Sequence, residues 1–403
     1  MRIAQINMIH YGSTGKIMLQ IAETARKHGH QVRTYSTNPF DKNERVICTL
    51  NANHFVWGSE NENRIHYYLG SLLGRNGCFS KKGTADLIAN LKEFHPDIVH
   101  LHNLHKFCIN LPMLFKYLKE SNVRVVWTLH DCWTMTGQCP YFTMVKCEKW
   151  KIGCEDCPQL NVYPRSRIDN SKWMYKHKKE WFTGIYDMTI VTPSEWLAGI
   201  VKQSFLKDYP VQVINNGIDL SVFHPMQSSF RKCNKIHDDT FLILGVASGW
   251  GKRKGLDVFI ELAKRLGKQY QIVLVGTDSK VDLQLPANII SIHKTQNQQE
   301  LAEIYSAADL FVNPTREENY PTVNMESIAC GTPVLTFRTG GSPEILDNTC
   351  GCVVDCDDID AMEKEIKCIM DKKPYTLEQC LTKAKTFDME LKFEEYVKLY
   401  ERH

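Results

Sequence analysis

The sequence predicts an α/β protein with two doubly wound, mostly parallel sheets in separate domains. Short apolar runs typical of buried strands alternate with longer segments of helical periodicity along the chain. These runs fall into two sets, and the stretch NNGIDLSVFHPMQSS between them is rich in turn-forming residues. The chain has 403 residues, which is too long for one ordinary hydrophobic core and fits two.

Ten strands are expected, divided equally between the two halves. They cover residues 2–7, 31–36, 98–101, 124–128 and 188–192 in the first half, and 241–246, 272–275, 289–292, 310–313 and 334–337 in the second. We place a first domain at 1–218, with a cysteine-rich insertion at about 132–160, a second domain at 219–387 and an amphipathic helix at 388–403. Because parallel α/β sheets bind ligands beyond the carboxyl ends of their strands, we look for functional residues there.

The composition is that of an ordinary globular enzyme. Hydrophobic residues make up 43% and charged residues 24%, and the net charge of +3 is too small to indicate a nucleic-acid partner. The first residues lack a signal-peptide pattern, and no run of about 18 apolar residues predicts a membrane span. A cytoplasmic protein is therefore expected, and its fifteen cysteines are expected to be reduced thiols.

Two glutamates, Glu318 and Glu326, flank the point where a loop after the 310–313 strand is expected to become a helix. Thr322 is the expected N-cap of this helix, and Gly331 is expected just after its end. Free backbone N–H groups at a helix start suit a phosphate, and here they would belong to Thr322, Val323 and Asn324. Carboxylates accept hydrogen bonds from vicinal hydroxyls, so the pair predicts sugars on either side of a diphosphate. Surface or capping glutamates are the alternative interpretation.

Longer motifs around these residues resemble a known family. They are GKRKGLDVFIELA, ELAEIYSAADLFVNPTREEN, ACGTPV and GGSPEI in the second half, NNGID and FHP at the boundary, and GSTGKI and HDCWTMTGQC in the first half. Together they resemble the retaining glycosyltransferases of family 4, or glycosyl transferases group 1, which have the GT-B fold. Bacterial enzymes of the polysaccharide and colanic acid type are the members that the chain resembles.

The resemblance implies two Rossmann-like domains facing a cleft, with the donor held mainly by the second and the tail helix returning to the first. It implies that Glu326 binds ribose hydroxyls and that Glu318 contacts the transferred sugar. The chain departs from the family where Asn319, Tyr320 and Pro321 replace Gly-Phe-Gly. Tyr320 and Pro321 are therefore expected to lie at the donor and to change how the backbone approaches the sugar.

A basic turn follows the first strand of the second half. Lys252, Arg253 and Lys254 lie in a glycine-rich stretch before a helix, where cations can neutralise a departing diphosphate. A solvated charged loop is the alternative. Lys254 matches the lysine of the family motif. The family arginine lies five positions earlier, at Gly249 in this chain, and Arg253 is the candidate to replace it.

The segment GSTGK near the start is not a P-loop. His10 occupies the first glycine position of that pattern, and Ile17 stands where Ser or Thr is required. We instead expect a flexible loop from Gly12 to Gly15 that opens a helix, and the resemblance places it near the diphosphate and the acceptor. A plain tight turn is the alternative.

Several histidines follow strand ends in the first half. The resemblance implies that His130 contacts the donor sugar, whereas a packing histidine is the alternative. His100 and His102 would point the same way from a strand, toward packing neighbours, and their spacing with His105 matches no zinc signature. Asn103 and His105 are weaker candidates to face the acceptor.

Four cysteines of the insertion, Cys139, Cys147, Cys154 and Cys157, form a candidate structural zinc site. The last two make a Cys-x2-Cys pair, which suits tetrahedral zinc, and Cys132 lies outside the set. Free thiols or a disulfide are the alternatives. Four protein ligands would leave no open position, so this zinc would be structural.

The resemblance implies retention of configuration and no metal cofactor for catalysis. The stretch DCDDID follows an apolar strand and is predicted to be a loop and helix cap. Lys254, Arg253 and the helix amides would stabilise the departing diphosphate, while Glu318 and His130 orient the sugar. A sugar-nucleotide epimerase or phosphorylase of this fold and a non-catalytic nucleotide-binding scaffold are the alternative functions.

The expected partners are a nucleotide-diphosphate sugar and a glycan or lipid-linked glycan acceptor. The segment 171–182, SKWMYKHKKEWF, mixes lysines with two tryptophans and could contact an anionic membrane from its inner face. An ordinary helix with both tryptophans in the core is the interpretation that we favour.

Overall fold

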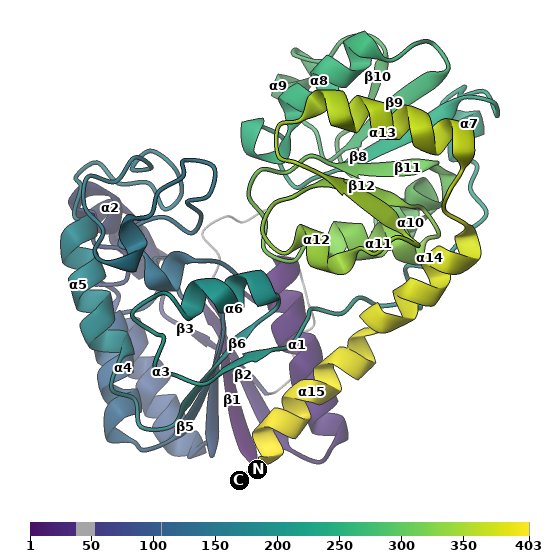
Figure 1. The fold of residues 1–403 in the computed structure, drawn as a ribbon. Helices are drawn as coiled ribbons and strands as arrows, with labels where there is room; N and C mark the ends of the chain where they lie inside the picture. The colour runs from purple at the N-terminus through teal and green to yellow at the C-terminus, as the bar shows by residue number, and fades with distance from the viewer. Residues whose placement is uncertain (38–52, 106, 403) are drawn as a thin grey trace. The chain divides into compact units, whose positions relative to one another are not determined.

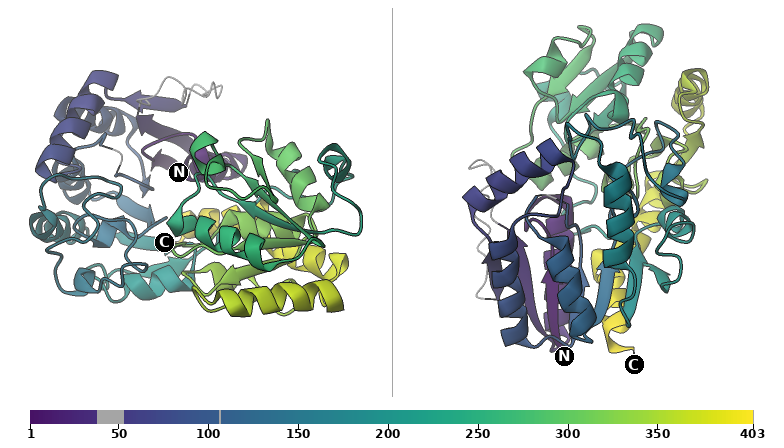
Figure 2. Two further views of the ribbon diagram at one scale, coloured as in Figure 1. Left: turned by 90° about the horizontal axis from the view of Figure 1, so that it is seen from above. Right: turned by 90° about the vertical axis from the view of Figure 1, so that its left-hand side faces the viewer.

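The computed structural model describes residues 1–37, 53–105 and 107–402. The chain divides into two compact units, of which the first is Met1–Asn215 with Phe393–His403 and the second is Asn216–Lys392. Each unit is a parallel sheet with helices on both faces (Figure 1 and Figure 2). This is the α/β architecture that the sequence predicts.

The sheet of the first unit has seven parallel strands in the order β3-β2-β1-β4-β5-β6-β7. The strands are β1 Arg2–Ile6, β2 Gln31–Thr37, β3 His54–Trp57, β4 Ile98–Leu101, β5 Arg124–Thr128, β6 Met188–Thr192 and β7 Val211–Val213. The chain first extends the sheet to one side of β1 and then returns to the other side with β4. The polar segments after β1 and β4 therefore lie next to each other, since these two strands pair.

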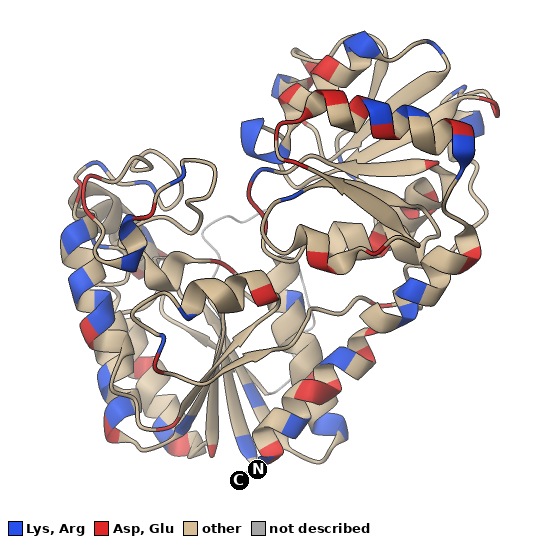
Figure 3. Ribbon diagram, viewed as in Figure 1, with Lys and Arg blue, Asp and Glu red and all other residues tan. Residues whose placement is uncertain are grey.

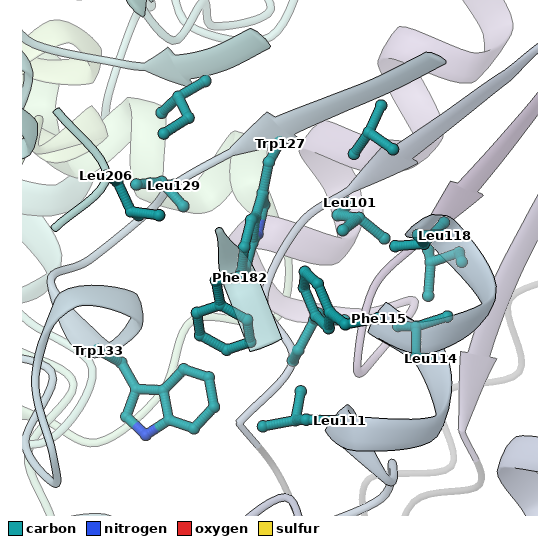
Figure 4. Packing of buried hydrophobic residues seen from close by; sticks show 14 of the residues in the cluster. Leu101, Leu111, Leu114, Phe115, Leu118, Trp127, Leu129, Trp133, Phe182 and Leu206 are labelled. Atoms are coloured by element: carbon teal, nitrogen blue, oxygen red, sulfur yellow. The ribbon is translucent and has the colours of Figure 1, made fainter. Parts of the chain in front are cut away.

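The helices of the first unit bury apolar stripes against this sheet. They are α1 Gly12–Lys27, α2 Glu60–Leu73, α3 Lys81–Phe94, α4 Leu111–Glu120, α5 Ser171–Phe182 and α6 Glu195–Val201, with 3₁₀ turns η2 Trp133–Met135 and η3 Lys149–Lys151. In α4 the buried residues recur at helical spacing, as Leu111, Leu114, Phe115 and Leu118. Phe115, Trp127 and Phe182 all pack against one another, and Figure 4 shows this part of the core.

The sheet of the second unit has six parallel strands in the order β10-β9-β8-β11-β12-β13. The strands are β8 Phe241–Val246, β9 Tyr270–Val275, β10 Ile289–Ile292, β11 Leu310–Asn313, β12 Val334–Phe337 and β13 Gly351–Val354. The helices are α7 Phe230–Cys233, α8 Leu256–Arg265, α9 Ser279–Asp282, α10 Gln298–Ala307, α11 Thr322–Ala329, α12 Ser342–Ile345, α13 Ile359–Lys372 and α14 Leu377–Ala384, with 3₁₀ turns η4 Lys252–Lys254 and η5 Lys385–Phe387.

The last helix, α15 Met389–Glu401, carries the aromatic residues of the predicted amphipathic tail. Its residues from Phe393 onward belong to the first unit. The hydroxyl of Tyr400 lies 2.6 Å from Nδ1 of His100, and Arg124 donates hydrogen bonds to the carbonyls of Leu399 and Tyr400. The last carbonyl groups of a helix have no partner within the helix, and here the Arg124 guanidinium supplies hydrogen-bond donors to two of them.

All ten expected strands are present, with ends shifted by one or two residues at β1, β2 and β9. Two further strands, β3 and β7, were not expected. Both lie at the edges of the first sheet, and β7 has only three residues, all partly exposed, so neither carries the apolar run that marks a central strand. The strand β13 is the apolar strand expected before DCDDID.

Candidate functional site

The candidate donor residues of the second unit lie where its strand order reverses. Strands β8 and β11 are parallel neighbours, so the turn after β8 and the loop after β11 leave the sheet at the same edge. Gly255 joins η4 to α8 with φ +75°, and a Cβ there would lie 2.4 Å from the Pro314 carbonyl oxygen. Glycine at this position therefore lets the basic turn pack directly on the loop that carries Glu318.

Lys254 and Glu318 form an ion pair at this junction. The Lys254 Nζ lies 2.5 Å from Oε2 of Glu318, and both side chains are largely buried. Burial would raise the pKa of Glu318, but the positive charge and hydrogen bond of Lys254 lower it below its usual value. Glu318 is therefore an anion at neutral pH, and the ammonium uses one of its three donors on it.

A second residue of the same loop, Arg316, fixes the basic turn. Its guanidinium makes two 2.8 Å bonds to the carboxylate of Asp257 and one of 2.6 Å to Asp357, and it also donates to the Lys252 carbonyl. The Arg316 backbone N–H donates to the Arg253 carbonyl at 2.9 Å. Arg316 was not among the predicted site residues. Charge alone did not distinguish it in the sequence, because Glu317 and Glu318 follow it directly.

Arg253 lies against the Glu318 loop, where its Nη1 donates to the Glu317 carbonyl at 3.3 Å. Its charge also helps to lower the pKa of Glu318. The structure therefore brings Arg253, Lys254 and Glu318 together.

The start of α11 differs from the prediction in two ways. The N-cap residue is Pro321 and not Thr322, so the Thr322 hydroxyl does not cap the helix. The backbone N–H of Asn324 already donates to the Pro321 carbonyl at 3.2 Å, so the expectation of a free amide there is wrong. The Asn324 side chain is also buried and accepts from Asn313. The helix amides that remain as candidates for a phosphate are those of Thr322 and Val323.

Glu326 lies in the second turn of α11 and is only partly buried. The hydroxyl of Tyr305 donates to its Oε2 at 3.3 Å. Burial, with the nearby Glu326 charge, raises the pKa of Tyr305 well above its usual value, so this hydroxyl stays a donor. Tyr320 packs in the core of the second unit, so only its backbone remains a candidate to approach a sugar.

In the first unit, His130 follows β5 and stacks on His102, which follows β4. Nε2 of His130 lies 3.1 Å from Nδ1 of His102, and the two rings are nearly parallel. Burial lowers the pKa of His130 to about 4, although Asp131 opposes the shift. His130 is thus neutral at pH 7, as suits a group that hydrogen-bonds a sugar hydroxyl. His100 and His102 pack together, which confirms their predicted packing role.

A second polar group forms beside this pair. Nε2 of His105 lies 2.9 Å from Oδ2 of Asp131, and its Nδ1 lies 2.9 Å from the Tyr163 hydroxyl. Burial would raise the pKa of Asp131, but His105 lowers it, which keeps the carboxylate charged. Tyr163, far along the chain in a loop, could not be predicted as part of this group.

The glycine segment near the start is helical and not a loop. Helix α1 begins at Gly12, so Gly12 to Gly15 form its first turn, and the expected flexible loop is wrong. A Cβ at Gly15 would lie 2.5 Å from the carbonyl carbon of His10, so glycine is required for the turn after β1 to pack on α1.

The four cysteines of the insertion all line one small cavity, of about 20 Å³. The thiol groups of Cys139 and Cys157 are hydrogen-bonded to each other, and the Gly137 backbone N–H lies 3.2 Å from the Cys154 sulfur. All four are free cysteines. Across residues 1–37, 53–105 and 107–402, no group of three or more His, Cys, Asp or Glu side chains is positioned to hold a metal ion. The zinc site thus stays a prediction.

The acidic stretch DCDDID is a loop and helix cap, which confirms its interpretation. Asp358 caps α13 by accepting from the Ala361 N–H at 2.8 Å. The other three carboxylates pair with arginines, in the pairs Asp355–Arg338, Asp357–Arg316 and Asp360–Arg265. These carboxylates are already engaged by protein partners.

Two family models cover most of the chain. Residues 14–222 match the model described as Glycosyltransferase Family 4, which is more than half of the chain, and residues 239–372 match Glycosyl transferases group 1. The chain belongs to glycosyltransferase family 4. It is therefore a glycosyltransferase, and its two parallel sheets are those of the GT-B fold.

Relatives and solved structures agree with this assignment. A putative colanic acid biosynthesis glycosyl transferase, WcaC of Escherichia coli K12, is 25% identical over 78% of this chain and 82% of its own length. Sucrose-phosphate synthase from Thermosynechococcus elongatus covers 99% of this chain and 98% of its own at 17% identity, with a TM-score of 0.73. HepE of Anabaena, solved with UDP, covers 99% of each chain at 15% identity, with a TM-score of 0.70.

Proposed function

We propose that this glycosyltransferase moves a sugar, with retention of configuration, from a nucleotide-diphosphate sugar to a hydroxyl of a glycan or lipid-linked glycan acceptor. The observation that carries the proposal is the Lys254–Glu318 pair at the strand reversal of the second sheet, beside the start of α11. HepE, which shares the fold, was solved with UDP-glucose, and WcaC is named for colanic acid. Surface polysaccharide synthesis at the cytoplasmic face is the setting that we propose.

Each residue has a separate role in this proposal. Glu326, held by Tyr305, accepts hydrogen bonds from the ribose hydroxyls, and Glu318 accepts them from the transferred sugar. Lys254, Arg253 and the amides of Thr322 and Val323 stabilise the diphosphate as it leaves. His130 is proposed to donate to the sugar as a neutral imidazole.

The reaction breaks the bond between the anomeric carbon and the diphosphate oxygen. The acceptor oxygen bonds to that carbon on the same face, and the acceptor proton goes to a phosphate oxygen of the departing nucleoside diphosphate. No side-chain nucleophile is needed. No divalent metal is proposed, since the carboxylates of Asp355–Asp360 are engaged in a cap and three ion pairs. Structural zinc on Cys139, Cys147, Cys154 and Cys157 is proposed separately.

The test begins with a thermal-shift panel of UDP, GDP and ADP and their sugar conjugates, with and without EDTA. Ligand at about 100 times its dissociation constant should add about 2.7 kcal/mol of stability. One selective nucleoside diphosphate is expected, and its effect should survive brief EDTA. Glu326→Gln should then weaken nucleotide binding, whereas Glu318→Gln should reduce turnover more than affinity. Unimpaired turnover in both variants would contradict the site assignment.

A further inference from the structure

Helix α2 of the first unit shows its apolar side to the outside. Ile65, Tyr68, Leu69 and Leu72 recur at helical spacing, and all are exposed, with Tyr68 at 69% and Ile65 at 58%. The residues that α2 buries are Asn63, His66 and Gly70, which are polar or small. This arrangement is the reverse of an ordinary surface helix, whose apolar stripe faces the core.

The buried side of α2 is satisfied without these apolar residues. Asn63 donates to the Thr37 hydroxyl at 2.7 Å, and Nδ1 of His66 lies 2.8 Å from the Ser80 hydroxyl. Local hydrogen bonds therefore fix which side of the helix faces inward. The exposed stripe is a built feature of the fold, and rotation of α2 cannot hide it without breaking those bonds.

A second apolar segment lies beside the end of α2. The Arg167 backbone N–H donates to the Ser71 carbonyl at 2.8 Å, which places residues 162–168 along the helix. Val162, Tyr163 and Ile168 of this segment are exposed. With Tyr67, the two segments hold eight of the fifteen exposed large apolar side chains in the described part of the chain. Such a concentration marks an interaction surface.

Cationic groups border this surface. A cavity of about 280 Å³ is lined by Tyr67, Tyr68, Ser71 and Leu72 together with two exposed arginines, Arg165 and Arg167. The Arg75 guanidinium lies 4.4 Å from the ring centre of Trp173 on α5. Helix α5 adds the exposed residues Lys172, Lys176 and Lys179, and Figure 3 colours the positions of its basic residues blue on the ribbon. The nearby acidic Glu60 is already paired with Arg64.

We propose that the α2 face, made of Ile65, Tyr67, Tyr68, Leu69, Leu72, Val162, Ile168, Arg165 and Arg167, binds an anionic phospholipid bilayer. Apolar and tyrosine side chains enter the boundary between headgroups and acyl chains, while guanidinium groups contact phosphates. No helix in the described part of the chain is long and apolar enough to cross a membrane, so attachment through a surface is the mode that this face supports.

At 171–182 we considered a membrane contact but favoured an ordinary helix, and the segment is the helix α5. The membrane contact that we now propose lies on α2. Trp173 and Trp181 of α5 are half-buried, and Trp173 stacks on His177 at 3.8 Å, so they are neither core residues nor fully exposed anchors. Tyr163 joins the α2 face to the polar group after β4, because its ring is exposed while its hydroxyl lies against His105. A lipid-linked acceptor held at the α2 face would thus lie next to His105.

The inference deepens the proposed function, but its test does not depend on turnover. The purified full chain is floated with vesicles of phosphatidylcholine containing about one third phosphatidylglycerol, and with phosphatidylcholine alone. We expect binding to the anionic vesicles that falls with added salt. Ile65→Ser/Leu69→Ser/Leu72→Ser should weaken it at least about tenfold. The matched control, Tyr186→Ser/Leu283→Ser/Leu391→Ser, removes three exposed apolar side chains elsewhere and should leave it unchanged.

The outcomes separate the possibilities. Failure of the wild-type chain to bind anionic vesicles, or equal binding by the α2 triple variant, would overturn the proposal. A dimer that the α2 variant abolishes, seen by ultracentrifugation without vesicle binding, would assign the face to a second copy of this chain. Calorimetry of both unfolding transitions, without ligand, checks that each variant is folded in the first unit as well as in the second. Vesicle binding without sugar transfer would refute the proposed function and leave this inference standing.

Discussion

Replacing Lys254 with methionine tests whether its ion pair with Glu318 is what keeps a buried carboxylate charged. The two side chains are 20% and 16% exposed, and 2.5 Å separates Nζ from Oε2. Methionine keeps most of the volume but leaves Glu318 with the Asn319 N–H at 3.2 Å and the more distant Arg253 charge. Breaking a fully buried pair costs about 3–5 kcal/mol, and partial exposure reduces this to about 2–3 kcal/mol.

The loss should depend on pH in a defined direction. In the wild type the lowered pKa of Glu318 contributes stability that is present above the unfolded value of about 4.3 and is lost as the pH falls through the folded pKa. In the variant, burial is the dominant effect and raises the pKa of Glu318. Protonation of Glu318 as the pH falls then removes the unpaired buried charge and reduces the loss of stability. The difference in unfolding free energy between the two proteins should therefore be larger at about pH 8 than at about pH 5.

Calorimetry measures this difference for Lys254→Met, Glu318→Gln and the double variant. The relevant transition is the one that shifts with the nucleoside diphosphate, since bound ligand stabilises only the unit that binds it. The double variant should be more stable than Lys254→Met at pH 7, because it carries no unpaired carboxylate. Turnover of Lys254→Met should fall about 10²–10³-fold through lost stabilisation of the diphosphate. Additive effects of the two substitutions, or a stability loss independent of pH, would refute this account of the pair.

Three further predictions address other parts of the molecule. Arg316→Lys, which cannot make the paired bonds to Asp257, should raise KM for the donor about tenfold in steady-state assays, whereas Arg338→Lys at an exposed pair should change little. Tyr305→Phe should weaken nucleoside diphosphate binding about fivefold in calorimetry, and unchanged affinity would show that its hydroxyl does not orient Glu326. Metal analysis of protein purified under reducing conditions should find about one zinc per chain, lost in Cys154→Ser. Four reactive thiols without zinc, or a disulfide by mass, would contradict this.

The central strands and the strand ends could be predicted, because both leave local signals in the sequence. A strand buried on both faces is a continuous apolar run, and a polar segment that follows it must lie at the carboxyl edge of the sheet. This places Lys254, Glu318 and His130 correctly at strand ends. The edge strand β7 leaves no such signal, because half of its environment is solvent. The flexible loop predicted at Gly12–Gly15 was wrong for a related reason, because glycine is also favoured by a positive φ at a helix start, as at Gly12, and by close packing of a helix on a turn, as at Gly15.

The side-chain partners at the site could not be predicted, because they depend on strand order. Arg316 follows β11, Asp257 follows β8, and Asp357 follows β13, which is not a neighbour of β11 in the sheet. The apolar pattern places each of these residues beyond a strand end without saying which strands are adjacent. Arg316 joins the loop that carries Glu318 to the turn that carries Lys254. A substitution that displaces this loop should therefore also displace the turn. The groups proposed to bind the sugar and the diphosphate are therefore expected to move together. Changing only the sugar of the donor should then change the size of the turnover loss that a Lys254 substitution causes.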